Sequence, residues 1–233
     1  MVADVVADVL ASEMTETTPD VTALIRAVEQ ADSPDRLVAA VGALANAQVE
    51  AGIPTLIQAL GYNNPGAAMM AVRGLVQLGK TAVPDLLNQL DGYNYGARSY
   101  AIRALAAIAD PRALDILQQS ALTDFAPSVR RAAAKGLGQV QWADYAEGDP
   151  VVAQTAVLHT LTQMIRDADW SIRYAAIVGL DGLGRTVTDP DLQQQVCTQL
   201  QQFSHDDGDA GVRARAQAAL APTPLTVNAV GHH

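Results

Sequence analysis

The sequence has little of the residue types that build metal sites and hydrolase active sites. It contains one cysteine, Cys197, among 233 residues, which excludes an intramolecular disulfide and indicates a reducing compartment, so a cytoplasmic protein is expected. Walker, nucleophile-elbow and HExxH motifs are absent. The four histidines have no neighbours at the spacing of a zinc site or a catalytic triad. They are His159, His205, His232 and His233.

Basic residues and long apolar runs are also scarce. The chain has 15 Lys and Arg against 25 Asp and Glu, with a formal net charge of -10, which argues against a general nucleic-acid binder. No apolar run approaches the roughly 20 residues that span a bilayer. The beginning of the sequence lacks the basic residues that open a secretory signal. We therefore expect neither nucleic acid nor a membrane as a partner.

The middle of the chain departs from this acidic balance. Residues 98–135 contain three aspartates and six basic residues, whereas residues 1–20 contain five acidic residues and no basic one. The basic residues of this segment are Arg98, Arg103, Arg112, Arg130, Arg131 and Lys135. It is a basic segment within an acidic protein.

One pattern is repeated along the chain, most clearly over residues 64–78, 95–108 and 127–140. Apolar residues in each copy follow helical spacing, and a second helical segment comes after each. Such a unit buries its apolar face against its neighbours, so we predict an all-α, right-handed α-solenoid of about six helical hairpins. Aligned leucines recur at spacings of 31, 30, 32, 43 and 40 residues. They are Leu44, Leu75, Leu105, Leu137, Leu180 and Leu220.

The predicted solenoid forms one elongated domain over residues 19–220, in preference to two ordinary domains. An acidic extension, 1–18, and a C-terminal tail, 221–233, are expected to be disordered, with Met14 as a candidate first residue. Two stretches lengthen the later repeats, from Gln139 to Ala153 and from Arg185 to Pro190.

An arginine stands seven residues before the aligned leucine in the last four copies, where the first two copies have Leu37 and Ala68. We interpret these arginines as a ladder that binds acidic residues or helix-end carbonyls of a neighbouring repeat. The first repeats then deviate as a terminal or partner-contacting repeat would. The ladder residues are Arg98, Arg130, Arg173 and Arg213.

Two equivalent turns contain tyrosines, Tyr62 in one and Tyr93 and Tyr95 in the next. Asparagine and glycine suit turns, but the flat tyrosine rings also suit a protein interface or a planar ligand. Outside the ladder, Arg103 and Arg131 are available to bind carboxylates.

Three strings resemble one known family: Tyr-Asn-Asn-Pro-Gly-Ala at 62–67, Tyr-Asn-Tyr-Gly-Ala-Arg at 93–98 and Asp-Phe-Ala-Pro-Ser-Val-Arg-Arg at 124–131. They resemble the HEAT-like phycobilisome lyases, and among these the F-type subunit of the E/F phycocyanobilin lyase for the phycocyanin α subunit. The resemblance covers about residues 20–220.

The resemblance implies one subunit of a heterodimeric lyase that is active only with an E-type partner. It would attach phycocyanobilin by a thioether bond to a cysteine of the phycocyanin α subunit, with the bilin bound as substrate and no cofactor. The nucleophile belongs to the acceptor, so a catalytic Cys or His is not required. Relatives that isomerise the bilin have a His-Cys pair, whereas Val196 precedes Cys197 here, which predicts attachment without isomerisation.

With a bilin as ligand, the basic segment and the aromatic turns provide candidate site residues. Asp124 is the candidate catalytic residue, as a hydrogen-bond acceptor for the pyrrole nitrogens. Candidates for the propionates are Arg98, Arg103 and Arg131, and candidates for ring stacking are Tyr62, Tyr95 and Trp142. Two other interpretations stay open: a phycobilisome-degradation factor that binds or detaches bilins, and a non-catalytic repeat adaptor.

Overall fold

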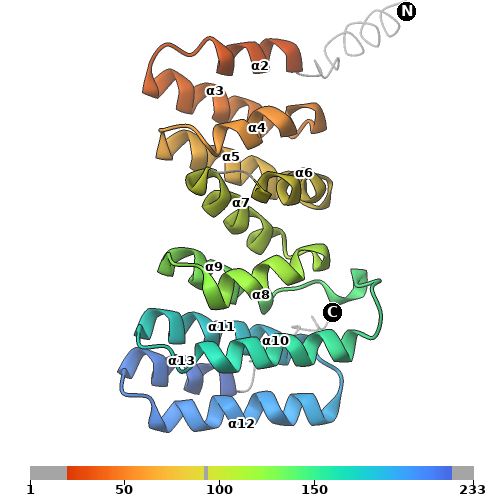
Figure 1. Cartoon of the computed structure of the whole chain (residues 1–233), viewed down its shortest axis with the longest axis vertical. Helices are drawn as coiled ribbons and strands as arrows, with labels where there is room; N and C mark the ends of the chain where they lie inside the picture. Colours follow the sequence, from red (N-terminus) through yellow and green to blue (C-terminus); the bar gives the residue numbers. More distant parts are fainter. Residues whose placement is uncertain (1–19, 92–93, 222–233) are drawn as a thin grey trace, which may run out of the picture.

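In the computed structural model, which describes residues 20–91 and 94–221, paired helices stack along one axis (Figure 1). The two terminal segments that were expected to be disordered, 1–18 and 221–233, lie outside the described residues, except for Ala221. Tyr93 also lies outside them. The helices are α2 (Val21–Glu29), α3 (Pro34–Ala47), α4 (Ile53–Ala59), α5 (Pro65–Leu78), α6 (Val83–Asn88), α7 (Tyr95–Ile108), α8 (Leu114–Thr123), α9 (Pro127–Leu137), α10 (Pro150–Met164), α11 (Trp170–Thr186), α12 (Pro190–Asp206) and α13 (Ala210–Leu220).

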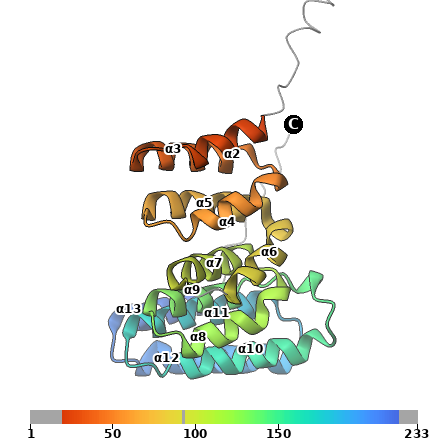
Figure 2. The same ribbon diagram turned by 45° about the horizontal axis from the view of Figure 1, so that its top comes forward.

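The helices form two layers. Helices α3, α5, α7, α9, α11 and α13 pack side by side in the first, which we call layer A. Helices α4, α6, α8, α10 and α12 cover it as layer B, and α2 packs against α3 at the N-terminal end (Figure 2). The predicted all-α, right-handed solenoid of about six hairpins is confirmed.

Polar caps and prolines set where the helices begin. Ser33 and Asn64 cap α3 and α5, each accepting a hydrogen bond from a backbone N–H of the first turn, the usual role of these residue types at a helix start. Pro54 and Pro84 occupy the second position of α4 and α6, where the missing N–H of proline has no partner to lose. Pro111 opens a 3-10 turn, Pro111–Ala113, and not α8 itself.

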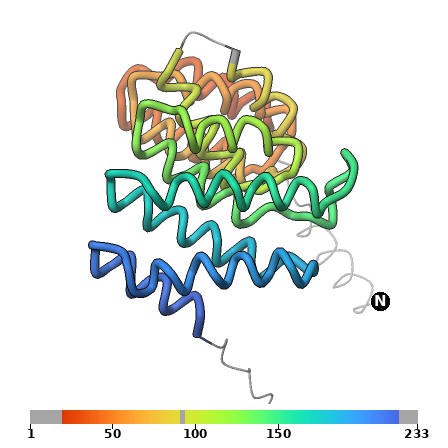
Figure 3. The backbone as a smooth tube through the Cα atoms, turned by 60° about the horizontal axis from the view of Figure 1, so that its bottom comes forward, coloured from red at the N-terminus to blue at the C-terminus, as the bar shows by residue number. Residues whose placement is uncertain are grey.

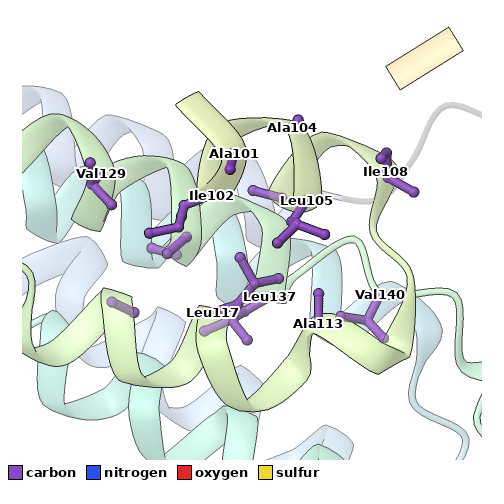
Figure 4. Close-up of a cluster of buried hydrophobic side chains, with 14 of the residues drawn as sticks. Ala101, Ile102, Ala104, Leu105, Ile108, Ala113, Leu117, Val129, Leu137 and Val140 are labelled. Carbon is purple, nitrogen blue, oxygen red and sulfur yellow. The ribbon is translucent and has the colours of Figure 1, made fainter. Parts of the chain in front are cut away.

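The core lies between the layers. Figure 4 shows Ile102 and Leu105 of α7 pointing toward Leu117 of α8 and Leu137 of α9, and all four side chains are fully buried. The aligned leucines of the first five copies are buried in the same way, while Leu220 at the C-terminal end is partly exposed. The repeat alignment therefore identified the positions that build the core.

The two predicted insertions differ in structure. The first runs as an irregular segment with one 3-10 turn, Trp142–Asp144, from the end of α9 to α10, and it projects from the edge of the stack (Figure 3). In the second, α11 continues to Thr186 and α12 begins at Pro190, so only residues 187–189 lie outside a helix. The first therefore adds much the longer loop.

Three of the four ladder arginines connect successive repeats. Arg98 donates to Asp124, Arg130 to Asp167, and Arg173 to both carboxylate oxygens of Asp207. Each of these aspartates also accepts a hydrogen bond from the backbone N–H two residues later. The last ladder residue, Arg213, donates to the backbone carbonyl of Asp207. The predicted ladder is confirmed for Arg98, Arg130 and Arg173, whereas Arg213 binds the turn before its own helix.

The first repeats use asparagine in place of this ion pair. The side-chain amide of Asn64 donates to the carbonyl of Pro34, and that of Asn94 donates to the carbonyl of Gly61. Both asparagines also cap their own helices. The deviation of the early repeats is thus a change from charged to neutral connections.

Close packing in layer A requires glycine at selected positions. A Cβ atom on Gly136 of α9 would lie 2.7 Å from both Cα and Cβ of Ala106 in α7. We expect Gly136→Ala to lower the free energy of unfolding by about 1–3 kcal/mol, because the two backbones would have to separate. Gly42→Ala is the control, since its Cβ would meet only Met70 at an ordinary 3.8 Å. Urea denaturation of both variants tests this, and equal effects would contradict it.

The Arg173–Asp207 pair makes stability depend on pH. Hydrogen bonding from Arg173 holds the pKa of Asp207 below its usual value, and the carboxylate is buried, with 2% of its side chain exposed. We expect Asp207→Asn to cost about 2 kcal/mol at pH 7. The difference from wild type should be full above the unfolded aspartate pKa of about 4 and should vanish as the pH falls through the lowered folded pKa.

Denaturation at several pH values measures this difference. Asp32→Asn is the matched control, because Asp32 pairs with Arg36 but has 68% of its side chain exposed, and exposed pairs contribute little. A loss that stays constant down to acidic pH, or an equal loss in the control, would contradict the prediction.

Candidate functional site

The structure brings three of the seven predicted site residues together, at the step between α7 and α9. The carboxylate of Asp124 accepts hydrogen bonds from the guanidinium of Arg98 at 2.8 Å, the hydroxyl of Tyr95 at 2.9 Å and the backbone N–H of Ala126 at 2.9 Å. Only 1% of the Asp124 side chain is exposed. Three donors therefore already saturate much of this carboxylate.

An aromatic pair covers the cluster. The ring of Phe125 stacks on that of Tyr95, with centroids 4.2 Å apart and an angle of 29° between the planes, while 77% of Phe125 is exposed. Burial and the hydrogen bond to Asp124 raise the pKa of Tyr95, so its hydroxyl stays protonated as a donor. Phe125 was not among the predicted site residues, although it lies within one of the strings that carry the family resemblance.

Arg103 and Arg131 lie on the outer side of layer A. The guanidinium of Arg103 sits 5.4 Å from the ring centre of Tyr100, one helical turn away in α7. Arg131 of α9 donates to the hydroxyl of Ser171 in α11 at 3.0 Å. Neither arginine forms an ion pair with a residue in the described ranges, so both remain able to bind an anion.

Tyr62 and Trp142 lie away from these groups. Tyr62 is in the turn before α5, on the same edge as Tyr95 but one repeat earlier, and 37% of it is exposed. Trp142 follows α9 and packs edge-on against Tyr145 at 5.9 Å. The neighbouring Gln141 binds carbonyls at the C-terminal end of α7, and Tyr95 begins that helix. A 14-residue helix spans about 20 Å, so Trp142 lies on the opposite edge.

The outer side of layer A carries two further cations that were not among the predicted site residues, Arg73 in α5 and Lys135 in α9. Both occupy the helical position of Arg103, nine residues after the N-cap. Counting from the caps would have found them. The predicted roles of all seven residues toward a ligand stay predictions.

Other features of the described residues offer less chemistry. No group of three or more His, Cys, Asp or Glu residues in them could hold a metal ion. No helix among them is long and apolar enough to cross a membrane. A groove between α10 and α12 is lined mainly by threonines, glutamines and His159. A second hollow is lined in part by the ion pairs Lys80–Asp144 and Arg112–Asp110.

The chain is similar to known proteins over most of its length. A family model for HEAT repeats matches residues 83–157. A protein of Nostoc sp. (strain PCC 7120) named phycocyanobilin lyase subunit beta is 58% identical over 192 residues, 82% of this chain and 94% of its own length. A Synechocystis sp. protein named phycocyanin alpha phycocyanobilin lyase CpcF is 48% identical over 168 residues, 72% of this chain and 78% of its own length.

Solved structures agree with this relationship. A chain from the complex of CpcE and CpcF of phycocyanin lyase from Nostoc sp. has 57% sequence identity and a TM-score of 0.67, covering 73% of this chain and 99% of its own length. The archaeal HEAT-like repeat protein of Thermococcus onnurineus has 13% identity, a TM-score of 0.52 and coverage of 85% of both chains, a likeness of fold alone. With a relative 58% identical over nearly its whole length, this chain belongs to the family of phycocyanobilin lyase β subunits.

Proposed function

We propose that this chain is the F-type subunit of a heterodimeric bilin lyase, active only with an E-type partner. The complex attaches phycocyanobilin by a thioether bond to a cysteine of the phycocyanin α subunit. The observation that carries the proposal is the similarity across 94% of the Nostoc lyase β subunit. A solved relative comes from a complex of CpcE and CpcF, which supports the heterodimer. The name of the Synechocystis relative supports the α-subunit acceptor.

The reaction needs no nucleophile from this chain. The acceptor thiolate adds to the exocyclic ethylidene carbon of the bilin, a C–S bond forms, and a proton is taken up at the adjacent ring carbon, so no oxidant or reductant is consumed. The lyase contributes by orienting the two reactants and by shielding the bilin from water. We propose that the bilin binds as substrate, that no further cofactor takes part, and that the reaction occurs in the cytoplasm.

The proposed charged site residues fall into two groups, those without an ion pair to a described residue and those that form one. Arg103 and Arg131 form no ion pair with a described residue, and we propose them for the propionates. Asp124 and Arg98 bind each other in the ladder, so a role for Asp124 toward the pyrrole nitrogens would require it to exchange one of its donors for the bilin. We therefore propose that this pair acts mainly in positioning α7 and α9.

Co-expression tests the proposed activity. We expect this chain, an E-type partner, the apo α subunit of phycocyanin and a bilin source together to give a covalent, zinc-fluorescent product on a denaturing gel. Omitting the partner should abolish the product. Product formed without any partner would contradict the subunit assignment, loss of existing adduct would favour a detachment factor, and no effect on adduct would favour an adaptor.

The product spectrum tests attachment without isomerisation. Cys197 follows Val196, which is buried in α12, and the chain has no His-Cys pair of the kind associated with isomerising relatives. The acid-denatured product should therefore have the absorbance of bound phycocyanobilin. A phycoviolobilin spectrum would contradict this prediction.

A further inference from the structure

The three central helices of layer A carry charge of only one sign. Helices α5, α7 and α9 contain six basic residues and no acidic one, in a chain with a net charge of -10. Two of the six, Arg98 and Arg130, are neutralised by ladder aspartates. The other four are Arg73, Arg103, Arg131 and Lys135.

Three of these four cations have the same helical register. Each lies nine residues after the N-cap of its helix: Arg73 after Asn64, Arg103 after Asn94, and Lys135 after Ala126. We call these three residues the basic row. The corresponding position holds Gly42 in α3 and Val178 in α11, so the row ends at α5 and α9.

The register directs the basic row away from the core. The residues two positions before and two positions after each cation are fully buried. Successive residues of a helix are about 100° apart around its axis. Each cation is therefore about 200° from the two buried residues that flank it and lies on the opposite side of the helix. Arg73 and Lys135 are accordingly exposed and Arg103 is partly exposed. The buried pairs are Ala71 and Leu75, Ala101 and Leu105, and Ala133 and Leu137.

Nothing in the described ranges neutralises the basic row. Arg73, Arg103 and Lys135 form no ion pair with a residue that the structure describes. Arg131 lies four residues before Lys135 on the same helix, a like-charge spacing that destabilises helices. Repulsion of this kind is relieved when an anion binds between the cations.

Flat and soft apolar side chains lie beside the row. Tyr100 lies under the guanidinium of Arg103, and Met69, one turn before Arg73, is 48% exposed. Such side chains suit contact with a conjugated ring system. Neighbouring packed helices are about 8–10 Å apart, so cations on adjacent helices can each reach one of two carboxylate arms carried by neighbouring rings.

We infer that the basic row, together with Arg131 one turn before Lys135, binds the two propionates of the linear tetrapyrrole. Arg103 is the central cation and binds one propionate, and the other is bound by Arg73 on one side or by Arg131 and Lys135 on the other. The identity of this ligand rests on the proposed function. The ring system lies over Tyr100 and Met69. The row thereby sets how the bilin is oriented before the acceptor thiol arrives.

Binding to the E–F heterodimer tests the inference directly. Bilin absorbance is titrated with the complex carrying Arg73→Gln, Arg103→Gln or Lys135→Gln. We expect Arg103→Gln to weaken binding about tenfold, the size of a hydrogen bond to a charged group, and the outer variants to weaken it less. Arg103→Lys should restore part of the affinity. Arg166→Gln is the matched control, an exposed arginine after α10 with no ion pair to a described residue.

A second ligand separates propionate binding from other effects of the substitutions. The bilin dimethyl ester should bind wild type about tenfold more weakly than the diacid, and Arg103→Gln should cause no further loss with the ester. Equal binding of ester and diacid to wild type, or row variants that match Arg166→Gln, would overturn the inference. Loss of partner or acceptor binding with bilin affinity intact would also overturn it, in favour of a protein-docking face.

Covalent product formation distinguishes a failure of the inference about the basic row from a failure of the proposed function. If the wild-type complex yields the zinc-fluorescent adduct while the row variants bind bilin normally, the inference fails and the function stands. If the wild-type complex yields no adduct, the function itself fails.

Discussion

The arrangement of this protein depends on the step between successive helices of layer A, where an arginine of one repeat binds an aspartate at the start of the next. The aspartate also accepts a hydrogen bond from the backbone N–H two residues later, so one carboxylate fixes a turn and a neighbouring helix together. Removing either partner would leave a buried charge unpaired. The repeat therefore keeps both residues, and its stacking angle is set at the same point in each later copy.

This constraint determines where a ligand can bind. The N-terminal edge of α9 is occupied by the Arg98–Asp124 pair and covered by Tyr95 and Phe125. The faces between layer A helices are filled by small residues, since Gly136 already meets the backbone of α7. Side chains on the outer side of layer A point away from both the ladder and the core and remain free to vary. This outer side carries the cations that form no ion pair with a described residue.

Much of this could be predicted from the sequence because repetition reveals shared roles. The spacing of Arg98, Arg130 and Arg173 identified the ladder, although not its aspartates, which stand in turns whose geometry the spacing does not give. Trp142 was grouped with Tyr95 because both are aromatic residues near the basic segment. One follows a layer A helix and the other precedes one, so the length of a helix separates them. Arg73 was missed because charge was counted along the chain and not by helical register.

The isolation of the basic row within an acidic protein also bears on what it can bind. At physiological ionic strength, charges are screened over about 8 Å, close to the spacing of about 8–10 Å between packed helices. A large acidic surface placed on the row would extend beyond these three helices, over a chain in which acidic residues outnumber basic ones. A small dianion that lies within one screening length interacts with the row alone. The charge distribution therefore favours a compact ligand with two carboxylates over an extended acidic protein surface, as expected for an enzyme subunit that orients its substrate and leaves the nucleophile to the acceptor.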